Sequence, residues 1–279
     1  MSNTYTINRE KIKSAFAEYI RQYDSEDPKV QLKVCHTYRV AELCEEIAKG
    51  QKCSQRACDF AWLSGMLHDV GRFEQLRKYG TFLDAKSVDH AGLSADLLFG
   101  NIKENTMGAE DICYPQALRM YVEESLSATE CLWMEQVVRW HSAYELPQEM
   151  SGRKAFFANV LRDADKIDIL RVNVETPLEQ IYNVSTEELK NSVVTPEVIE
   201  AFAERHTILR SLKKTPVDHI VGHIALVFGL VFPESVQIVR QQGYLDRILS
   251  FVSDRKETRE QFVQLQEIVR EWYCQSQGQ

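Results

Sequence analysis

The segment AWLSGMLHDVGRF, residues 61–73, joins an apolar run to two adjacent side chains that can bind a metal ion. The run ends at His68 and Asp69, and Gly71 then allows the chain to turn. A charged group buried with an apolar run is destabilising unless it has a partner. We therefore expect His68 and Asp69 to meet further polar side chains from distant parts of the chain. The candidates for this role are His36, His90, His141 and Asp165.

The composition is that of an ordinary globular protein. The chain has 279 residues, of which 44% are hydrophobic and 27% are charged, and its formal net charge is -8. These values predict a soluble protein with a substantial core. A nucleic-acid polymer is not expected as a partner, because binding its phosphates needs a basic surface. A small phosphorylated substrate is compatible with the acidic chain, since a bound metal ion can reverse the local charge.

The seven cysteines favour a reducing environment. Their number is odd and no C-x-x-C pair occurs, so neither a disulfide framework nor a zinc knuckle is indicated. Residues 1–13 contain no apolar signal core, and the longest apolar run, residues 224–232, is too short to span a bilayer. We therefore expect a cytoplasmic protein that does not enter a membrane.

Helical periodicity dominates the chain and predicts an all-α fold. Glycines and prolines number only 12 and 7, and they cluster at breaks between stretches of helical spacing. No linker or internal repeat divides the chain, so a single domain over residues 1–279 is predicted. Residues 101–115 are expected to form a loop or an insert, and Ser87 is expected to cap the helix that follows it. The predicted helices cover residues 9–23, 28–50, 54–69, 88–99, 116–126, 129–141 and 154–172, with further helices after residue 176.

Each candidate ligand also has a plain structural interpretation. His36 lies in an apolar stripe between Leu32 and Val40, where a single histidine is more often a hydrogen-bonded core residue than a ligand. The same interpretation applies to His141, which follows an apolar ladder. Asp165 is more informative, because an uncompensated carboxylate near a core face would destabilise the fold.

The combination of these residues favours a metal site over separate core positions. Four histidines and two carboxylates fall on helix faces expected to be buried, and clustering around divalent cations would neutralise all six. Imidazole and carboxylate ligands without a thiolate suit iron, manganese, zinc, cobalt or nickel better than calcium, with magnesium as a further candidate. Asp69 offers two oxygens and can bridge two ions.

The order of these ligands resembles that of a known enzyme superfamily. The sequence HDVGRF, residues 68–73, resembles the HD-[IV]-G-[KR] signature of the HD superfamily of metal-dependent phosphohydrolases. The sequence LRDADKIDIL, residues 161–170, resembles the closing motif of that superfamily and indicates Asp165 as a ligand. The resemblance implies an HD-domain helical bundle over about residues 30–172, followed by a C-terminal helical extension over about residues 176–279.

Two further histidines match the binuclear branch of this superfamily, which includes HD-GYP proteins, cyclic-nucleotide phosphodiesterases and di-iron oxygenases. His141 is followed by Ser-Ala-Tyr-Glu, so the chain lacks the Gly-Tyr-Pro loop, and a cyclic dinucleotide substrate is not indicated. The resemblance implies one or two divalent metal ions held by six side chains. These ligands are His36, His68, Asp69, His90, His141 and Asp165.

The resemblance also implies a reaction, the hydrolysis of a small phosphorylated molecule such as a nucleotide by a phosphohydrolase or phosphodiesterase. A metal-activated hydroxide would attack phosphorus, with Asp69 orienting it. Arg72 and Lys166 are expected to stabilise the developing phosphoryl charge, and Ser64 to hydrogen-bond within the site. Two alternatives stay open, an HD-type di-iron oxygenase and a non-catalytic metal-binding signalling module. Assembly into a homo-oligomer is left open as well.

Overall fold

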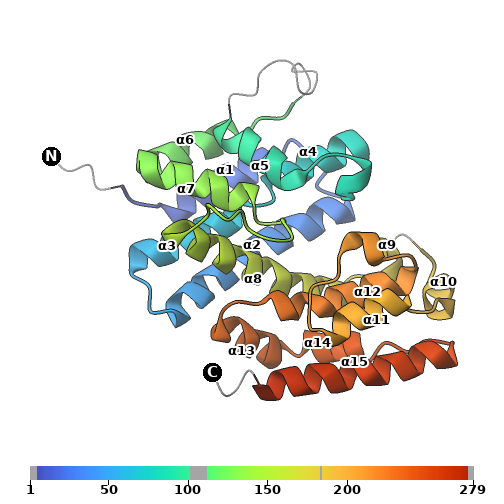
Figure 1. Ribbon diagram of the computed structural model, residues 1–279. Coiled ribbons are helices and arrows are strands. Elements are labelled where there is room, and N and C mark those ends of the chain that lie inside the picture. Colours follow the sequence, from blue (N-terminus) through green and yellow to red (C-terminus); the bar gives the residue numbers. More distant parts are fainter. Residues whose placement is uncertain (1–4, 101–111, 183, 276–279) are drawn as a thin grey trace. The chain divides into compact units, whose positions relative to one another are not determined.

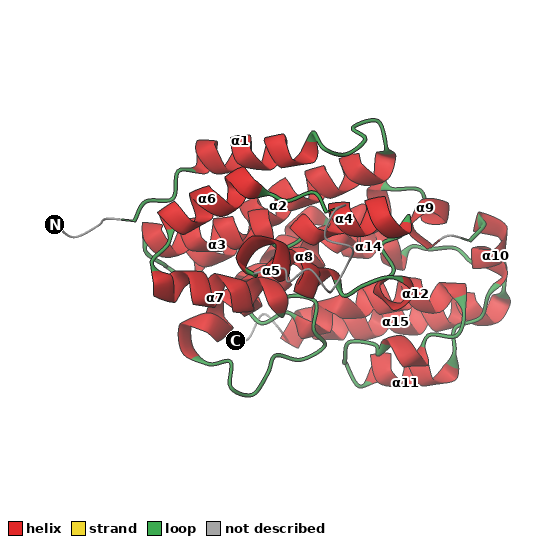
Figure 2. Cartoon of the chain, turned by 90° about the horizontal axis from the view of Figure 1, so that it is seen from above, coloured by secondary structure: helices red, strands yellow, loops and turns green. Residues whose placement is uncertain are grey.

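The structure is a computed structural model that describes residues 5–100, 112–182 and 184–275. Within these ranges the regular secondary structure is entirely helical, as Figures 1 and 2 show. This confirms the predicted all-α class, while the HD-type bundle stays a prediction. Most of the insert predicted at residues 101–115 lies outside the described residues.

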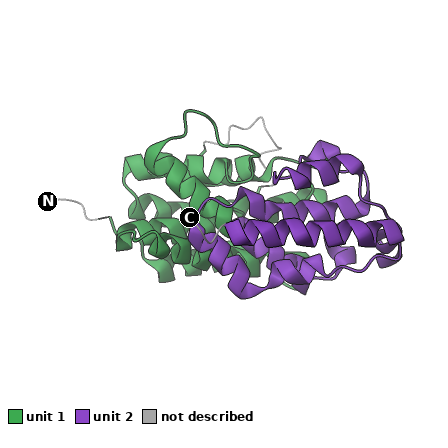
Figure 3. Cartoon of the chain, turned by 60° about the horizontal axis from the view of Figure 1, so that its bottom comes forward, with its two compact units in different colours: residues 1–164 green, residues 165–279 purple. Residues whose placement is uncertain are grey.

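The chain divides into two compact units, residues 1–164 and residues 165–279 (Figure 3). The boundary falls inside one long helix, α8 (Gly152–Glu175), to which both units contribute. The single domain predicted from the sequence, with an HD core over residues 30–172, stays a prediction.

The first unit contains most of the helices that carry the candidate ligands. Apart from the first part of α8, its elements are α1 (Arg9–Ile20), α2 (Pro28–Gly50), α3 (Gln55–Leu67), α4 (Val70–Tyr79), the 3-10 turn η1 (Asp84–Lys86), α5 (His90–Phe99), α6 (Gln116–Ser125) and α7 (Ala128–Arg139).

Local capping explains where these helices begin. Asp27 accepts a hydrogen bond from the backbone of Lys29, and Pro28 occupies the first turn of α2, as the sequence predicts. The expected start of α5 is wrong. The helix begins at His90 because the Asp89 carboxylate accepts hydrogen bonds from two backbone N–H groups, whereas the Ser87 hydroxyl donates to the Leu83 carbonyl.

The closest helix contact in the first unit depends on Gly65. Helices α2 and α3 pack together, and a Cβ atom placed on Gly65 would lie 2.5 Å from the Cα atom of Ala41. Only the missing side chain of glycine allows two backbones to approach so closely. The contact lies one turn before His68, so it also sets the distance between the two helices that carry His36 and His68.

We expect Gly65→Ala to destabilise the protein by about 1–3 kcal/mol, because the added methyl group meets backbone atoms that cannot move independently. Urea unfolding monitored by circular dichroism would measure the change. Glu46→Ala is the matched control, since Glu46 is an exposed position of α2 and should change the unfolding free energy by less than about 0.5 kcal/mol. Equal stability of the two variants would contradict the close-packing interpretation.

The second unit completes α8 and adds shorter helices. They are α9 (Leu178–Tyr182), α10 (Thr186–Asn191), α11 (Pro196–Ala203), the 3-10 turn η3 (Arg210–Leu212), α12 (Pro216–Ile224), the 3-10 turn η4 (Ala225–Gly229), α13 (Pro233–Gln242), α14 (Tyr244–Leu249) and α15 (Lys256–Gln275).

A buried carboxylate organises part of the second unit. Asp218 accepts hydrogen bonds from the backbone N–H groups of Thr195, Lys214 and Thr215, and from the Thr195 hydroxyl. These bonds tie the start of α11 to the start of α12 and satisfy backbone donors that a helix start leaves unpaired. In the part of the chain that the structure describes, no helix is both long and apolar enough to cross a membrane.

Candidate metal centre

Five of the predicted ligands meet in the first unit. His36 lies in the middle of α2, and His68 and Asp69 occupy the junction between α3 and α4. His90 is the first residue of α5, and His141 follows the end of α7. All five are buried, with between 0% and 4% of their surface exposed.

The first half of the cluster joins His36 and His68. Their Nε2 atoms lie 3.3 Å apart. The Oδ2 atom of Asp69 faces both nitrogens, at 3.6 Å from His36 and 3.5 Å from His68. Three potential ligand atoms therefore surround one point.

The second half of the cluster joins His90 and His141. Their Nε2 atoms lie 3.2 Å apart. The other oxygen of Asp69, Oδ1, faces this pair at 3.6 Å from His90 and 3.7 Å from His141. The rings of His68 and His141 also meet edge to face at 5.0 Å, so the two halves adjoin. Each oxygen of the Asp69 carboxylate thus faces the nitrogen atoms of one histidine pair.

The outer nitrogens of His68 and His141 are already engaged. The Nδ1 atoms of His68 and His141 lie 2.7 Å from the carbonyl oxygens of Gly65 and Val138. A carbonyl oxygen can only accept a hydrogen bond, so Nδ1 carries the proton in both rings and the Nε2 lone pair faces the cluster. Metal-binding histidines are commonly held in this tautomer by such a bond.

The geometry fits divalent metal ions. Two imidazole nitrogens about 2.0–2.1 Å from one tetrahedral ion lie about 3.3 Å apart, which is the separation within both histidine pairs. The Oδ1 atom of Asp69 is buried and accepts no hydrogen bond from the described residues. Lone pairs facing each other across such distances repel unless a cation lies between them. The buried groups His36–His68–Asp69 and Asp69–His90–His141 can therefore each hold a metal ion.

Lys33 is a functional candidate that the sequence analysis missed. Its Nζ atom lies 2.7 Å from Asp69 Oδ2, and both side chains are largely buried. Burial alone would raise the pKa of Asp69, but the positive charge of Lys33, the largest opposing effect, helps to hold that pKa well below its usual range. Lys33 precedes His36 by three residues on α2, and this helical spacing is the signal that identifies it.

Arg72 lies close to Asp69, as predicted, but it is held by neighbouring groups. Its Nε atom is 3.6 Å from Asp69 Oδ1, and its Nη1 atom donates to Gln75, to the Phe82 carbonyl and to Asp84. The guanidinium is therefore fixed beside the cluster with its charge near the bridging carboxylate.

Asp84 is a second residue that the sequence analysis missed. Its Oδ2 atom lies 2.7 Å from His90 Nδ1, which orients that ring. Burial, followed by the charge of Arg72, lowers the pKa of His90 to about 4, although Asp84 opposes the shift. A neutral His90 presents a free lone pair to a metal ion. Asp84 lies six residues before His90, a spacing that does not suggest contact without knowledge of the turn η1.

We expect Asp84→Asn to weaken divalent metal binding by about 10- to 100-fold, the usual effect of removing a carboxylate that supports a histidine ligand. Calorimetric titration of the metal-free protein with Mn²⁺ would measure it. Asp89→Asn is the matched control, because it removes the same charge next to His90 while asparagine still caps α5. Equal losses in both variants would show that charge alone, and not the bond to His90, is responsible.

His141 is positioned by the neighbouring helix α8. Arg162 Nη1 lies 3.3 Å from the Trp140 carbonyl and 3.4 Å from that of His141, and its Nη2 donates to the Tyr144 carbonyl at 3.0 Å. These bonds engage carbonyl groups of the turn that follows α7, where the Trp140 carbonyl also accepts from the Ala143 backbone at 3.3 Å. One guanidinium therefore fixes the turn that carries this candidate ligand.

The remaining predicted residues have other surroundings. Ser64 donates to the Ala61 carbonyl at 2.7 Å, and its expected hydrogen bond within the site stays a prediction. A helix-interior hydroxyl readily bonds a carbonyl of the preceding turn. Asp165 and Lys166 lie on α8 in the second unit, where Lys166 Nζ donates to the Gly229 carbonyl. Their predicted roles as metal ligand and phosphoryl-binding cation stay predictions.

Comparison of the chain with protein-family models, with curated proteins and with solved structures found no match.

Proposed function

We propose that this protein is an HD-type metal-dependent phosphohydrolase or phosphodiesterase that acts on a small phosphorylated molecule. One observation carries the proposal, namely a single buried carboxylate whose two oxygens each face a separate pair of histidine nitrogens. This arrangement provides for two adjacent cations with a shared ligand, and two-metal sites of this kind commonly act on phosphate esters.

The proposed roles follow from the positions of the side chains. His36, His68 and Asp69 would hold one ion, and Asp69, His90 and His141 the other, with Asp165 as a further ligand. When bound, divalent ions act as Lewis acids on a phosphoryl oxygen and lower the pKa of water. Asp84 orients the His90 ring so that its Nε2 lone pair stays directed into the cluster.

Two cations at the cluster favour an anionic substrate. Lys33 Nζ lies beside Oδ2 of Asp69, and Arg72 Nε lies near Oδ1. Lys33 Nζ is also 5.5 Å, and Arg72 Cζ 5.7 Å, from the centroid of the Phe82 ring. Together with two divalent ions they outnumber the negative charges of Asp69 and Asp84. The local charge is then positive in a chain of net charge -8, which suits a phosphate group. Lys166 is proposed as an additional phosphoryl-binding cation.

A turnover screen with defined metals tests the proposal. The chain is purified in chelator and reloaded with Mn²⁺, Co²⁺, Zn²⁺ or Fe²⁺, and phosphomonoesters, cyclic nucleotides and nucleoside triphosphates are supplied under nitrogen. The proposal expects phosphate or nucleoside monophosphate release from at least one class, with loss of turnover in chelator. A metal-loaded protein that cleaves none of them would instead support a non-catalytic metal-binding signalling module.

A di-iron oxygenase is the second candidate function. The ligand set consists of nitrogen and oxygen donors without thiolate, and a bridging carboxylate suits a pair of iron ions. The dependence of turnover on dioxygen distinguishes the two functions, because hydrolysis proceeds under nitrogen and an oxygenase consumes dioxygen in proportion to product. Mössbauer spectra of iron-loaded protein would show whether the two ions are coupled.

We also infer a reducing cytoplasmic location. All seven cysteines are free thiols, and five of them are buried or half-buried. The proposed partners are small phosphorylated molecules, not membranes or nucleic-acid polymers.

A further inference from the structure

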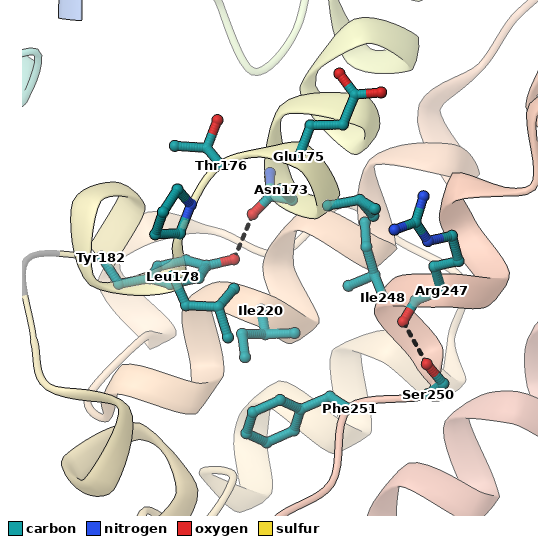
Figure 4. A pocket seen from close by; sticks show the side chains of 12 residues that line it. Asn173, Glu175, Thr176, Leu178, Tyr182, Ile220, Arg247, Ile248, Ser250 and Phe251 are labelled. Carbon is teal, nitrogen blue, oxygen red and sulfur yellow. Dashed lines mark hydrogen bonds between the residues drawn. The ribbon is translucent and has the colours of Figure 1, made fainter. Parts of the chain in front are cut away.

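The second unit contains a cavity of about 510 Å³ that includes none of the predicted site residues (Figure 4). Its walls come from the end of α8, from α9, from α12 and from the segment that begins in α14 and continues past its end. Small-molecule sites commonly have volumes of about 300–1,000 Å³. The cavity is therefore large enough for a ligand of moderate size.

About half of the cavity wall is apolar. Figure 4 shows the side chains of Leu178 and Ile220 on one side, Ile248 on the other and Phe251 below them. These side chains come from separate segments of the chain, so the folded unit brings them together around one space. Such a wall favours a ligand with a hydrocarbon or aromatic body.

A hydrogen-bond network fixes one side of the cavity. The Tyr182 hydroxyl donates to Asn173, His223 Nδ1 lies 2.7 Å from Asn173 Oδ1, and Asn173 Nδ2 donates to the Ile169 carbonyl at 2.8 Å. The rings of Tyr182 and His223 stack with centroids 5.6 Å apart. These polar groups form hydrogen bonds with one another, so they hold this part of the wall in a fixed shape. A charged group of a ligand would therefore bind to other residues of the lining.

One exposed cation at the cavity, Arg247, has no counter-ion among the residues that the structure describes. Glu175 is already engaged by Arg171 at 2.7 Å and by the Tyr244 hydroxyl at 2.8 Å. The Arg247 guanidinium makes no ion pair or side-chain hydrogen bond with any residue that the structure describes. The guanidinium of Arg247 is therefore available to a negatively charged group of a ligand, beside the apolar side chains of the wall.

We propose that this cavity binds a small monocarboxylate with an apolar body. The planar guanidinium of Arg247 can hold a carboxylate through two parallel hydrogen bonds, and the apolar body would lie against Leu178, Ile220, Ile248 and Phe251. A single cation matches a single negative charge, whereas a phosphate dianion would leave one charge unbalanced. The site is distinct from the proposed phosphohydrolase centre and does not depend on its chemistry.

Calorimetric titration of the full chain with octanoate, 4-phenylbutanoate and octan-1-ol tests the proposal. We expect saturable binding of at least one of the two carboxylates, and their relative affinities distinguish an aliphatic body from an aromatic one. Arg247→Gln should weaken carboxylate binding by about 10- to 100-fold and leave octan-1-ol unaffected, because only the carboxylate needs the charge. Arg270→Gln, an exposed position of α15, is the matched control and should bind like the wild type.

A second variant tests whether the ligand binds inside the cavity. Leu178 is half-buried at the wall, so Leu178→Trp should narrow the space beside the apolar side chains without overpacking a closed core, and should weaken binding of all three compounds by about 10-fold. Circular dichroism checks that the helix content is unchanged. The proposal is overturned if neither carboxylate binds at millimolar concentration, if Arg247→Gln binds them as tightly as the wild type, or if Leu178→Trp binds all three compounds as tightly as the wild type.

Discussion

Asp69→Asn is expected to abolish binding of the two proposed metal ions and, with it, the proposed metal-dependent turnover. The carboxylate is the only side chain that faces both histidine pairs among the described residues of the first unit, so one substitution damages both halves of the cluster. Asparagine keeps the shape of the side chain but loses the negative charge and one of the two oxygens. Removal of a residue that only supports a metal ligand lowers metal affinity by up to about 100-fold. Loss of Asp69, a ligand shared by both halves, should therefore lower the metal affinity of each half by at least about 100-fold.

Metal content per chain, measured by plasma mass spectrometry after gel filtration, is the primary measurement because it does not depend on knowing the substrate. Asp96→Asn is the matched control. Asp96 lies on α5 and forms an exposed ion pair with Arg139 at 2.7 Å, so it removes one carboxylate without touching the cluster. If Asp69→Asn retains the wild-type metal content, the bridging role of Asp69 is wrong and the proposed function loses its main support.

Lys33→Met is expected to have two opposite effects, tighter metal binding and a less stable metal-free protein. The ammonium lies 2.7 Å from Asp69 Oδ2, the oxygen that also faces His36 and His68. A cation bound there is repelled by Lys33. Unit charges 4 Å apart interact by about 4 kcal/mol at an effective dielectric constant of 20, so even a partly screened change corresponds to about 100-fold in affinity.

The loss of stability follows from the same contact. Without metal, Lys33 is the nearest counter-charge of a carboxylate that is 2% exposed, and its removal leaves that charge poorly compensated. Thermal unfolding in chelator should therefore begin at a lower temperature in Lys33→Met, while calorimetric titration with Mn²⁺ should show the gain in affinity. Lys29→Met, one turn earlier on α2, is the control because its Nζ atom contacts only the exposed Gly80 carbonyl. Weaker metal binding in Lys33→Met would show that Lys33 supports the ion and does not compete with it.

The fold class and much of the candidate cluster could be read from the sequence. Helical spacing of apolar residues predicts the helices, because a helix must bury one face whatever it packs against. The apolar run that ends at His68 and Asp69 places both residues at a helix end, which the junction of α3 and α4 confirms. His36, His90 and His141 could be linked to this pair through their expected burial and their resemblance to a superfamily pattern, but their spacing along the chain gives no distance in space.

Only the tertiary structure could show which contacts each of these side chains makes in the cluster. It showed that Asp69 divides its two oxygens between the histidine pairs, that Lys33 neutralises one of these oxygens and that Asp84 holds the His90 ring. Local sequence patterns describe neighbours within a few residues, such as the cap at Asp27, but a contact between helices depends on how closely their backbones approach. Gly65 permits that approach between α2 and α3, and the absence of one methyl group therefore sets the distance that the ligand pattern itself could not specify.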